Sequence, residues 1–292
     1  MAKSKSGGTR SYLRGRIASD VYSIGRDSAG KKQQVVRSLA EQVKNPQTVS
    51  QMRGRMIMST VMQAVSAMAL IIDHSFDGVP NGQPSISEFI RRNYALIKAD
   101  VAAHPAKDNS FGLNKYQEKG VKVGAYQVSN GKAILPSFVQ KPTIGSLILG
   151  LAVGAAATTA GAIRAALGID EKDYFTVCGI NSKGVFGYFR VNVSSALADD
   201  TTITEDNLSK LLVVDNPLGL TLEFNISDGN LLVSANDFDA SAVGIIYSNS
   251  VSGGFEHSTT VLKASSDPSF AADVALPTYP EGTERFLNGG DL

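Results

Sequence analysis

The sequence predicts an α+β protein, with a mixed helical and hairpin N-terminal domain followed by an antiparallel, immunoglobulin-like β-sandwich domain. Apolar residues recur at helical spacing between Met58 and Val101, whereas from residue 171 onward they alternate with polar residues at the period of a strand. The net charge also changes sign: residues 1–55 hold 12 Lys and Arg against 3 Asp and Glu, and residues 165–292 hold 6 against 18. We therefore expect two domains that differ in architecture and in charge.

Composition shifts divide the chain into five expected segments. Residues 1–17 predict a flexible basic arm, and residues 18–140 the helix and hairpin domain. Residues 141–169 predict a junction of small residues, residues 170–265 the β-sandwich, and residues 266–292 a polar C-terminal tail.

The first element expected is a hairpin over residues 18–38, with its turn at residues 27–30. A long helix follows, which begins near residues 46–49, with Pro46 in its first turn or with a Thr48–Gln51 capping box. It ends near Ile72, and its expected buried stripe is Met58, Val61, Val65, Met68 and Ile72. This helix also contains five of the six methionines, which indicate either an adaptable contact surface or a methionine-rich core.

A Ser85–Glu88 capping box predicts the start of a second helix, which continues to about Val101. Residues 121–135 predict a hairpin around Asn130–Gly131. Residues 144–163 contain no charge, but many are Gly, Ala, Ser or Thr, so their hydropathy is low for a membrane span. We expect a strand at residues 147–151 and a helix at residues 155–167 instead, and no membrane partner.

Three further hairpins are expected in the β domain, with turns at residues 181–184, 227–230 and 249–256. Three hairpins within one segment indicate an antiparallel sandwich. The only cysteine, Cys178, lies in an apolar strand pattern and predicts a buried thiol.

No arrangement of residues in the sequence predicts a reaction. The histidines at positions 74, 104 and 257 share no metal-ligand spacing with one another, with Cys178 or with an acidic cluster. The acidic pairs 199–200 and 205–206 predict a solvated loop and the first turn of a short helix after Thr204, where acidic side chains favour the helix dipole. We therefore expect neither an enzyme nor a cofactor or metal site.

The basic N-terminal region instead predicts an interaction surface. Its candidate residues are Arg10, Arg14, Arg16, Arg26, Lys31, Lys32, Arg37, Arg53 and Arg55. Arginines on a hairpin and a helix start suit an acidic protein surface, through bidentate pairs, or the phosphates of a nucleic acid.

The motifs Arg14-Gly-Arg16 and Gly25-Arg26 lead into Asn45-Pro46-x-Thr48-x-x-Gln51-x-x-x-Arg55, which opens the first helix, and the β domain ends in GIIYSNSVSGGFEHSTTVL. In this layout the chain resembles a group of uncharacterised proteins of Bacteroidota and their crAss-like bacteriophages. The resemblance implies a virion structural component of the neck or tail, made in the cytoplasm of the bacterial host, and it supplies no catalytic residues.

We therefore expect a ring or collar of identical subunits that also contacts other virion proteins, in which the basic start of one copy meets the acidic end of the next. The first alternative is a nucleic-acid-binding or packaging-associated protein that uses the basic segment. The second is a glycan-binding adhesin, against which the low aromatic content and the absence of Trp count.

Overall fold

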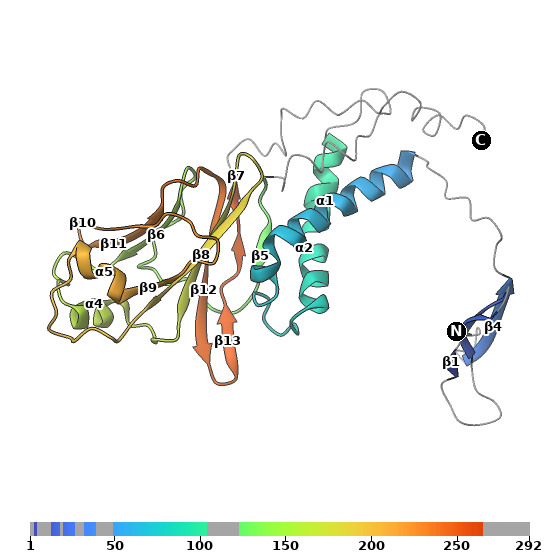
Figure 1. Cartoon of the computed structure of the whole chain (residues 1–292), viewed down its shortest axis with the longest axis horizontal. Coiled ribbons are helices and arrows are strands. Elements are labelled where there is room, and N and C mark those ends of the chain that lie inside the picture. Colours follow the sequence, from blue (N-terminus) through green and yellow to red (C-terminus); the bar gives the residue numbers. More distant parts are fainter. Residues whose placement is uncertain are drawn as a thin grey trace. The chain divides into compact units, whose positions relative to one another are not determined.

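The computed structural model describes residues 3–4, 13–17, 20–26, 32–38, 49–103 and 123–264 of the chain. The described residues form four helices and mostly antiparallel sheets, so the predicted α+β class is confirmed (Figure 1). The chain divides into two compact units, Met1–Pro46 and Gln47–Leu292. Within the second unit, the two long helices share a hydrophobic core with strands of the β domain, across the expected boundaries at residues 140 and 169.

The first unit is a four-stranded antiparallel sheet. Its strands, in spatial order, are β1 (Lys3–Ser4), β2 (Leu13–Ile17), β3 (Asp20–Arg26) and β4 (Lys32–Ser38). The predicted hairpin is confirmed, with Arg26 paired to Lys32 on either side of the turn. The expected flexible arm differs from the structure at β1 and β2, since Leu13–Ile17 adds to β3 as a third strand. The open edge of β3 offers backbone hydrogen bonds to β2. The composition of residues 1–17 does not reveal this pairing.

The second unit begins with two long helices, α1 (Val49–Ile72) and α2 (Gln83–Ala103), as predicted. Val61, Val65, Met68 and Ile72 are buried as expected, but Met58 is exposed and Ile57 is buried in its place. The stripe is therefore one residue out of phase at its start, because the inward face of α1 follows the 3.6-residue period back from Val61 to Ile57.

The second helix begins two residues before the predicted cap. The Ser85 hydroxyl donates to the Pro80 carbonyl at 2.9 Å, and the Glu88 carboxylate accepts from Arg91 and Arg92. The predicted Ser85–Glu88 capping box is therefore wrong, since both side chains have other partners.

The rest of the second unit consists mainly of two larger antiparallel sheets. The central sheet contains, in order, β13 (Gly254–His257), β12 (Ala240–Val251), β7 (Tyr174–Asn181), β8 (Phe186–Val193) and β9 (Leu212–Asp215), with β15 (Lys263–Ala264) also paired to β12. The other sheet contains, in order, β10 (Glu223–Ser227), β11 (Asn230–Ala235) and β6 (Leu147–Ala152). The smaller elements are α4 (Ala160–Leu167), α5 (Glu205–Leu211), and the pair β5 (Gln127–Ser129) and β14 (Thr260–Val261).

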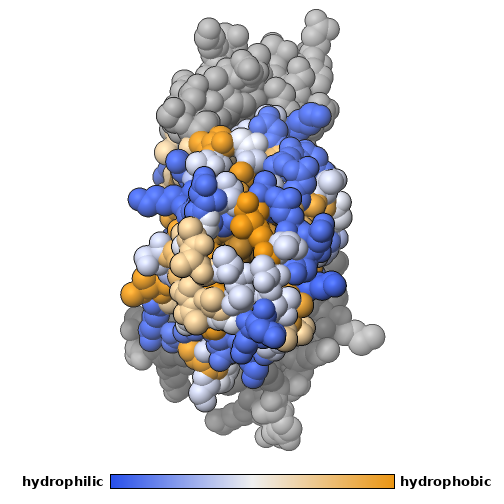
Figure 2. Space-filling model, turned by 90° about the vertical axis from the view of Figure 1, so that its left-hand side faces the viewer, coloured by the Kyte–Doolittle hydropathy of each residue, from blue (hydrophilic) through white to orange (hydrophobic). Residues whose placement is uncertain are grey.

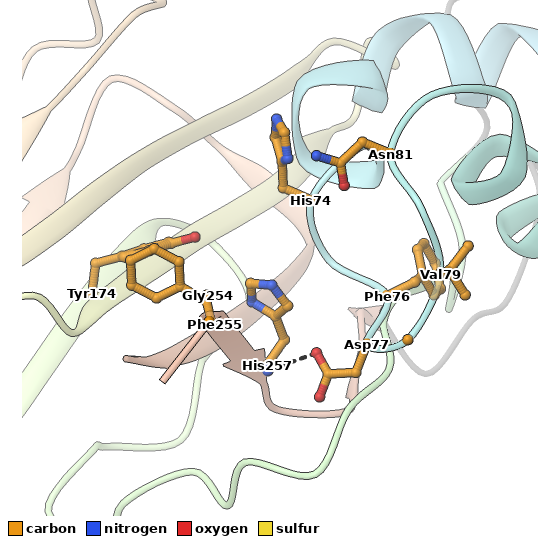
Figure 3. A pocket seen from close by; sticks show the side chains of 11 residues that line it. His74, Phe76, Asp77, Val79, Asn81, Tyr174, Gly254, Phe255 and His257 are labelled. Carbon is orange, nitrogen blue, oxygen red and sulfur yellow. Dashed lines mark hydrogen bonds between the residues drawn. The ribbon is translucent and has the colours of Figure 1, made fainter. Parts of the chain in front are cut away.

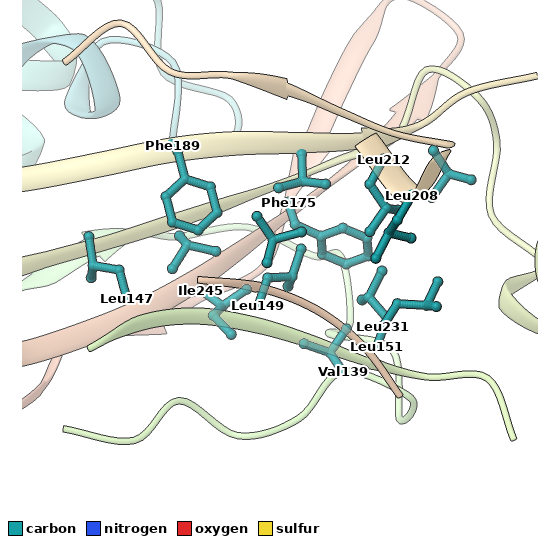
Figure 4. Close-up of a cluster of buried hydrophobic side chains, with 14 of the residues drawn as sticks. Val139, Leu147, Leu149, Leu151, Phe175, Phe189, Leu208, Leu212, Leu231 and Ile245 are labelled. Atoms are coloured by element: carbon teal, nitrogen blue, oxygen red, sulfur yellow. The ribbon is translucent and has the colours of Figure 1, made fainter. Parts of the chain in front are cut away.

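Both faces of the central sheet are covered. Phe175 and Val177 on one face of β7 belong to a core cluster shared with β6 and β11 (Figure 4). Cys178 and Ile180 belong to a second cluster, shared with α1 and α2. Side chains alternate between the faces of a strand, so β7 must be apolar at nearly every position. Two packed antiparallel sheets are compatible with a β-sandwich, but the immunoglobulin-like form is not confirmed.

Two of the hairpins predicted in the β domain are confirmed: β7–β8 and β10–β11. In the tight turn of the second, Asp228 and Gly229 have φ angles of 48° and 74°, the left-handed region that this sequence favours. The third hairpin turns around residues 252–253, and its return strand is β13 rather than residues 258–264. The hairpin predicted at residues 121–135 is wrong in its pairing, because β5 pairs with β14.

The uncharged run at residues 144–163 splits into a strand and a helix, as predicted. The helix begins at Ala160 rather than at residue 155, because the Thr159 side chain caps it and Gly154 has a φ of 82°. Within the described ranges, none of the helices combines the length and hydropathy that a membrane-spanning helix needs.

Candidate functional site

The predicted basic residues separate into the two units. Arg14 and Arg16 lie in β2, Arg26 lies in β3, and Lys32 and Arg37 lie in β4. Arg53 and Arg55 belong to α1 and so to the second unit. Arg10 and Lys31 lie outside the described residues.

The register of the small sheet places five of these positions in separate cross-strand rows. Arg16 pairs with Val21, and Val21 with Arg37, so two arginines share one cross-strand row. Arg26 pairs directly with Lys32, and Arg14 pairs with Lys3 on β1. Among these cations only the Arg37 side chain is described, and it is exposed.

The two units carry opposite net charge. Met1–Pro46 holds 10 Lys and Arg against 3 Asp and Glu, a net charge of +7, whereas Gln47–Leu292 holds 18 against 24, a net charge of −6.

The end of the second unit that holds β10, α4 and α5 has a mixed surface. Figure 2 shows this face, where hydrophilic residues lie between several apolar patches. Its exposed acidic side chains include Asp199, which pairs with Arg164, and Glu223, which accepts a hydrogen bond from Asn236. Both of these acidic side chains therefore have partners within the protein.

The acidic pairs at positions 199–200 and 205–206 behave as the sequence predicted. Glu205 and Asp206 occupy the first turn of α5 after Thr204, and the Thr204 amide donates to the Asn207 side chain at 2.8 Å. Across the residues that can be described, no group of three or more His, Cys, Asp and Glu side chains is placed to hold a metal ion.

A pocket of about 420 Å³ lies where the α1–α2 loop meets the central sheet (Figure 3). His74, Asp77 and Asn81 line it from the loop. Tyr174 lines it from β7, and Phe255 and His257 line it from β13. These residues come from segments up to 183 positions apart, so no spacing in the sequence could indicate that they meet.

Asp77 links the segments that form the wall of this pocket. Its Oδ1 accepts the backbone amide of His257 at 3.0 Å, and its Oδ2 accepts the backbone amide of Lys132 at 3.0 Å. Gly131 lies between these groups, where a Cβ atom would come within 2.2 Å of both the Asp77 side chain and the His257 carbonyl oxygen. The carboxylate is therefore a structural clamp between three segments, and both of its oxygens are already used.

His257 and Ser248 form a hydrogen-bonded pair at the floor of the pocket, with 2.9 Å between Nδ1 and Oγ. The Ser248 residue is only 1% exposed, so a substrate does not reach its hydroxyl. Burial lowers the pKa of His257, and His74 and Arg190 add to this effect against the opposing charge of Asp77. The pair is therefore a buried structural contact, although its residue types are those of a nucleophile and a base.

Aromatic rings form the other side of the pocket. Tyr174 and Phe255 pack edge to face with 5.1 Å between ring centroids, and the Arg190 guanidinium lies 5.8 Å from the Tyr174 centroid. Arg190 also donates to the Leu70 carbonyl at 3.4 Å, so it joins β8 to the end of α1. The carboxylate of Asp77 and the Nδ1 atom of His257 already form hydrogen bonds within the protein.

Cys178 is buried, as predicted, and desolvation raises the pKa of its thiol to about 12. The thiol lies against the Gly244 carbonyl oxygen at 3.6 Å. It is therefore a small core residue and not a nucleophile.

The chain was compared with protein-family models, curated proteins and solved structures, and none of them matches it.

Proposed function

We propose that this protein is a bacteriophage virion structural protein, a neck or tail ring or collar component that assembles through contacts between identical subunits. The observation that carries the proposal is the division of the chain into a basic sheet unit and a larger acidic unit, with net charges of +7 and −6. A basic unit that meets the acidic unit of the next copy makes a head-to-tail contact, and such contacts close into rings when the rotation fits.

The N-terminal sheet supplies the basic half of this contact. Its register flanks Val21 with Arg16 and Arg37 and pairs Arg26 with Lys32 further along the sheet, so one small unit carries all four of these cations. Arginine suits such docking because its planar guanidinium binds carboxylates through two parallel hydrogen bonds. The packed antiparallel sheets of the second unit, as a β-sandwich, provide the rigid body to which this unit docks.

Light scattering after size exclusion tests the assembly, and protein identification in purified particles tests the virion role. We expect oligomers at low salt that dissociate toward about 0.5 M salt, where the Debye length falls to a few ångströms. The triple substitution Arg14→Glu, Arg16→Glu and Arg37→Glu should abolish them, whereas the matched change Lys210→Glu on the acidic unit should not. A chain that stays monomeric under all conditions and is absent from particles refutes the proposal.

The same cations favour one other function, binding of a nucleic acid within the virion or during packaging. Phosphate contacts predict an affinity that falls steeply with salt, with a logarithmic slope near the number of phosphates neutralised. A binding titration with double-stranded DNA at several salt concentrations separates this function from protein docking. No binding at low salt excludes it.

A further inference from the structure

The outward face of α1 is uncharged over most of its length. No Asp, Glu, Lys or Arg occurs between Arg55 and Asp73. Three apolar side chains on this face are exposed: Met58 at 41%, Met62 at 44% and Leu70 at 60%. With the exposed Ser66 they form a continuous row at every fourth position, which we call the α1 ridge.

A helix on a protein surface normally presents charged or polar side chains to water, and one that is apolar all round is normally buried. The inward face of α1, from Ile57 to Ile72, already packs into the core with α2 and the central sheet. The ridge lies on the other side, and its row of every fourth residue is the kind that packs into the groove of another helix. Methionine fits such contacts well because its unbranched side chain adapts to its neighbour.

We propose that the α1 ridge binds the α1 ridge of a second copy of this chain, antiparallel, around a twofold axis at the level of Ala64. This pairing places Met58 opposite the partner's Leu70 and Met62 opposite the partner's Ser66. It also places Arg55 at the level of the partner's Asp73, at both ends of the contact. The inference rests on the proposed self-assembly and names one of its surfaces.

The charges at the ends of the ridge favour a second copy of this chain as the partner, with its α1 antiparallel. The centre of the ridge is uncharged, so two copies meet there without repulsion. The nearest charges on either side, Arg55 and Asp73, have opposite sign and lie at equal distances from Ala64 along the helix. An antiparallel pair therefore matches unlike charges, whereas a parallel pair would place Arg55 beside the partner's Arg55 and Asp73 beside the partner's Asp73.

The contact is small, since one helix ridge buries less than the roughly 1,200 Å² of a stable interface. On its own it therefore gives weak association, and its strength in an assembly comes from combination with the charged contact between units. An isologous contact of this kind and a head-to-tail contact use different surfaces, so both can be present in one assembly.

Disulfide trapping in the full-length chain tests the pairing and its direction. The Met58→Cys and Leu70→Cys variants are prepared separately and then mixed under mild oxidation. In an antiparallel pair the two substituted positions face each other, whereas two copies of position 58 lie about 18 Å apart along the axis. A disulfide needs Cα atoms within about 7 Å, so we expect heterodimers from the mixture at least tenfold above homodimers from either variant alone.

The chain offers two controls. Cys178 is buried, so it should not crosslink in the native protein. Leu218, which is 47% exposed on the loop between β9 and β10, provides a matched surface position through Leu218→Cys. As a second measurement, Met62→Glu should weaken self-association at least tenfold in sedimentation equilibrium, because it places two like charges near the axis.

The outcomes separate the ridge from the proposed function. Homodimers of Met58→Cys at the level of the mixture indicate a parallel pair and overturn the inference, as does equal crosslinking of Leu218→Cys. Oligomers that persist without any ridge crosslink overturn the inference but leave the assembly proposal standing. Ridge heterodimers from a protein that is absent from particles support the inference and refute the virion role.

Discussion

Removal of the buried Asp173 carboxylate should strongly destabilise the second unit. Its Oδ2 accepts the Tyr247 hydroxyl at 2.6 Å and the Asp170 amide at 3.3 Å, and its Oδ1 accepts the Ser250 amide at 2.7 Å. Asp173 is 1% exposed, so water does not replace these bonds when the side chain is shortened. It therefore joins the start of β7 to the far end of β12, next to the candidate pocket.

The expected loss of stability follows from the two shorter bonds, those of Tyr247 and Ser250. A hydrogen bond to a charged group contributes about 1.5–3 kcal/mol, and a buried donor left without a partner costs a similar amount. We therefore expect Asp173→Ala to lower the free energy of unfolding by about 3–5 kcal/mol. Burial and the neighbouring carboxylate both raise the pKa of Tyr247, so its hydroxyl stays protonated as the donor at neutral pH.

Urea unfolding at pH 7, followed by far-UV circular dichroism and by tyrosine fluorescence, measures the change. The partner variant Tyr247→Phe completes a double-mutant cycle with Asp173→Ala. We expect the double variant to be more stable than additivity predicts by about 1.5–3 kcal/mol, because both changes remove the same bond. A cost below about 1 kcal/mol for Asp173→Ala, or strict additivity, would show that this bond does not stabilise the fold.

Three more predictions concern α1, α2 and the pocket. On α1, Ile57→Ala should cost about 2–4 kcal/mol in urea unfolding while its exposed neighbour Met58→Ala costs under 0.5 kcal/mol, and equal costs would contradict the assigned inward face. On α2, the arginines beside Glu88 lower the pKa of its carboxyl from 4.5 to about 2. These ion pairs should therefore add about 1 kcal/mol to the free energy of unfolding above pH 4.5, and this contribution should be lost as the pH falls toward 2. The Glu88→Gln variant should therefore be less stable than the wild type at pH 7 and equal to it near pH 2, and a difference independent of pH would refute the pairing. In the pocket, burial lowers the pKa of His257 below 6.5, so the folded protein disfavours the protonated ring. The wild type should therefore lose stability as the pH falls below 6.5, and the His257→Gln variant should lose less. Thermal unfolding between pH 7 and pH 5 measures this difference.

The sequence by itself determined the local elements of this protein. Both long helices, the β3–β4, β7–β8 and β10–β11 hairpins, and the split of the uncharged run into β6 and α4 follow from spacing and turn residues. These signals are local, because a helical period or an Asp-Gly turn acts within a few residues. The burial of Cys178 was predicted in the same way, from the apolar strand around it.

The tertiary structure decided which segments meet. The Ser129 hydroxyl donates to the Ser258 carbonyl across 129 positions, and β5 pairs with β14 instead of closing the hairpin that Asn130–Gly131 indicates. The candidate pocket arises in the same way, from a helix loop and a hairpin far apart in the chain. The tertiary structure also decided which side of α1 faces the core, so that Ile57 is buried and Met58 is exposed. A residue's own neighbours in the sequence cannot fix these outcomes, because backbone pairing and burial depend on surfaces that exist only after the sheets and helices have packed.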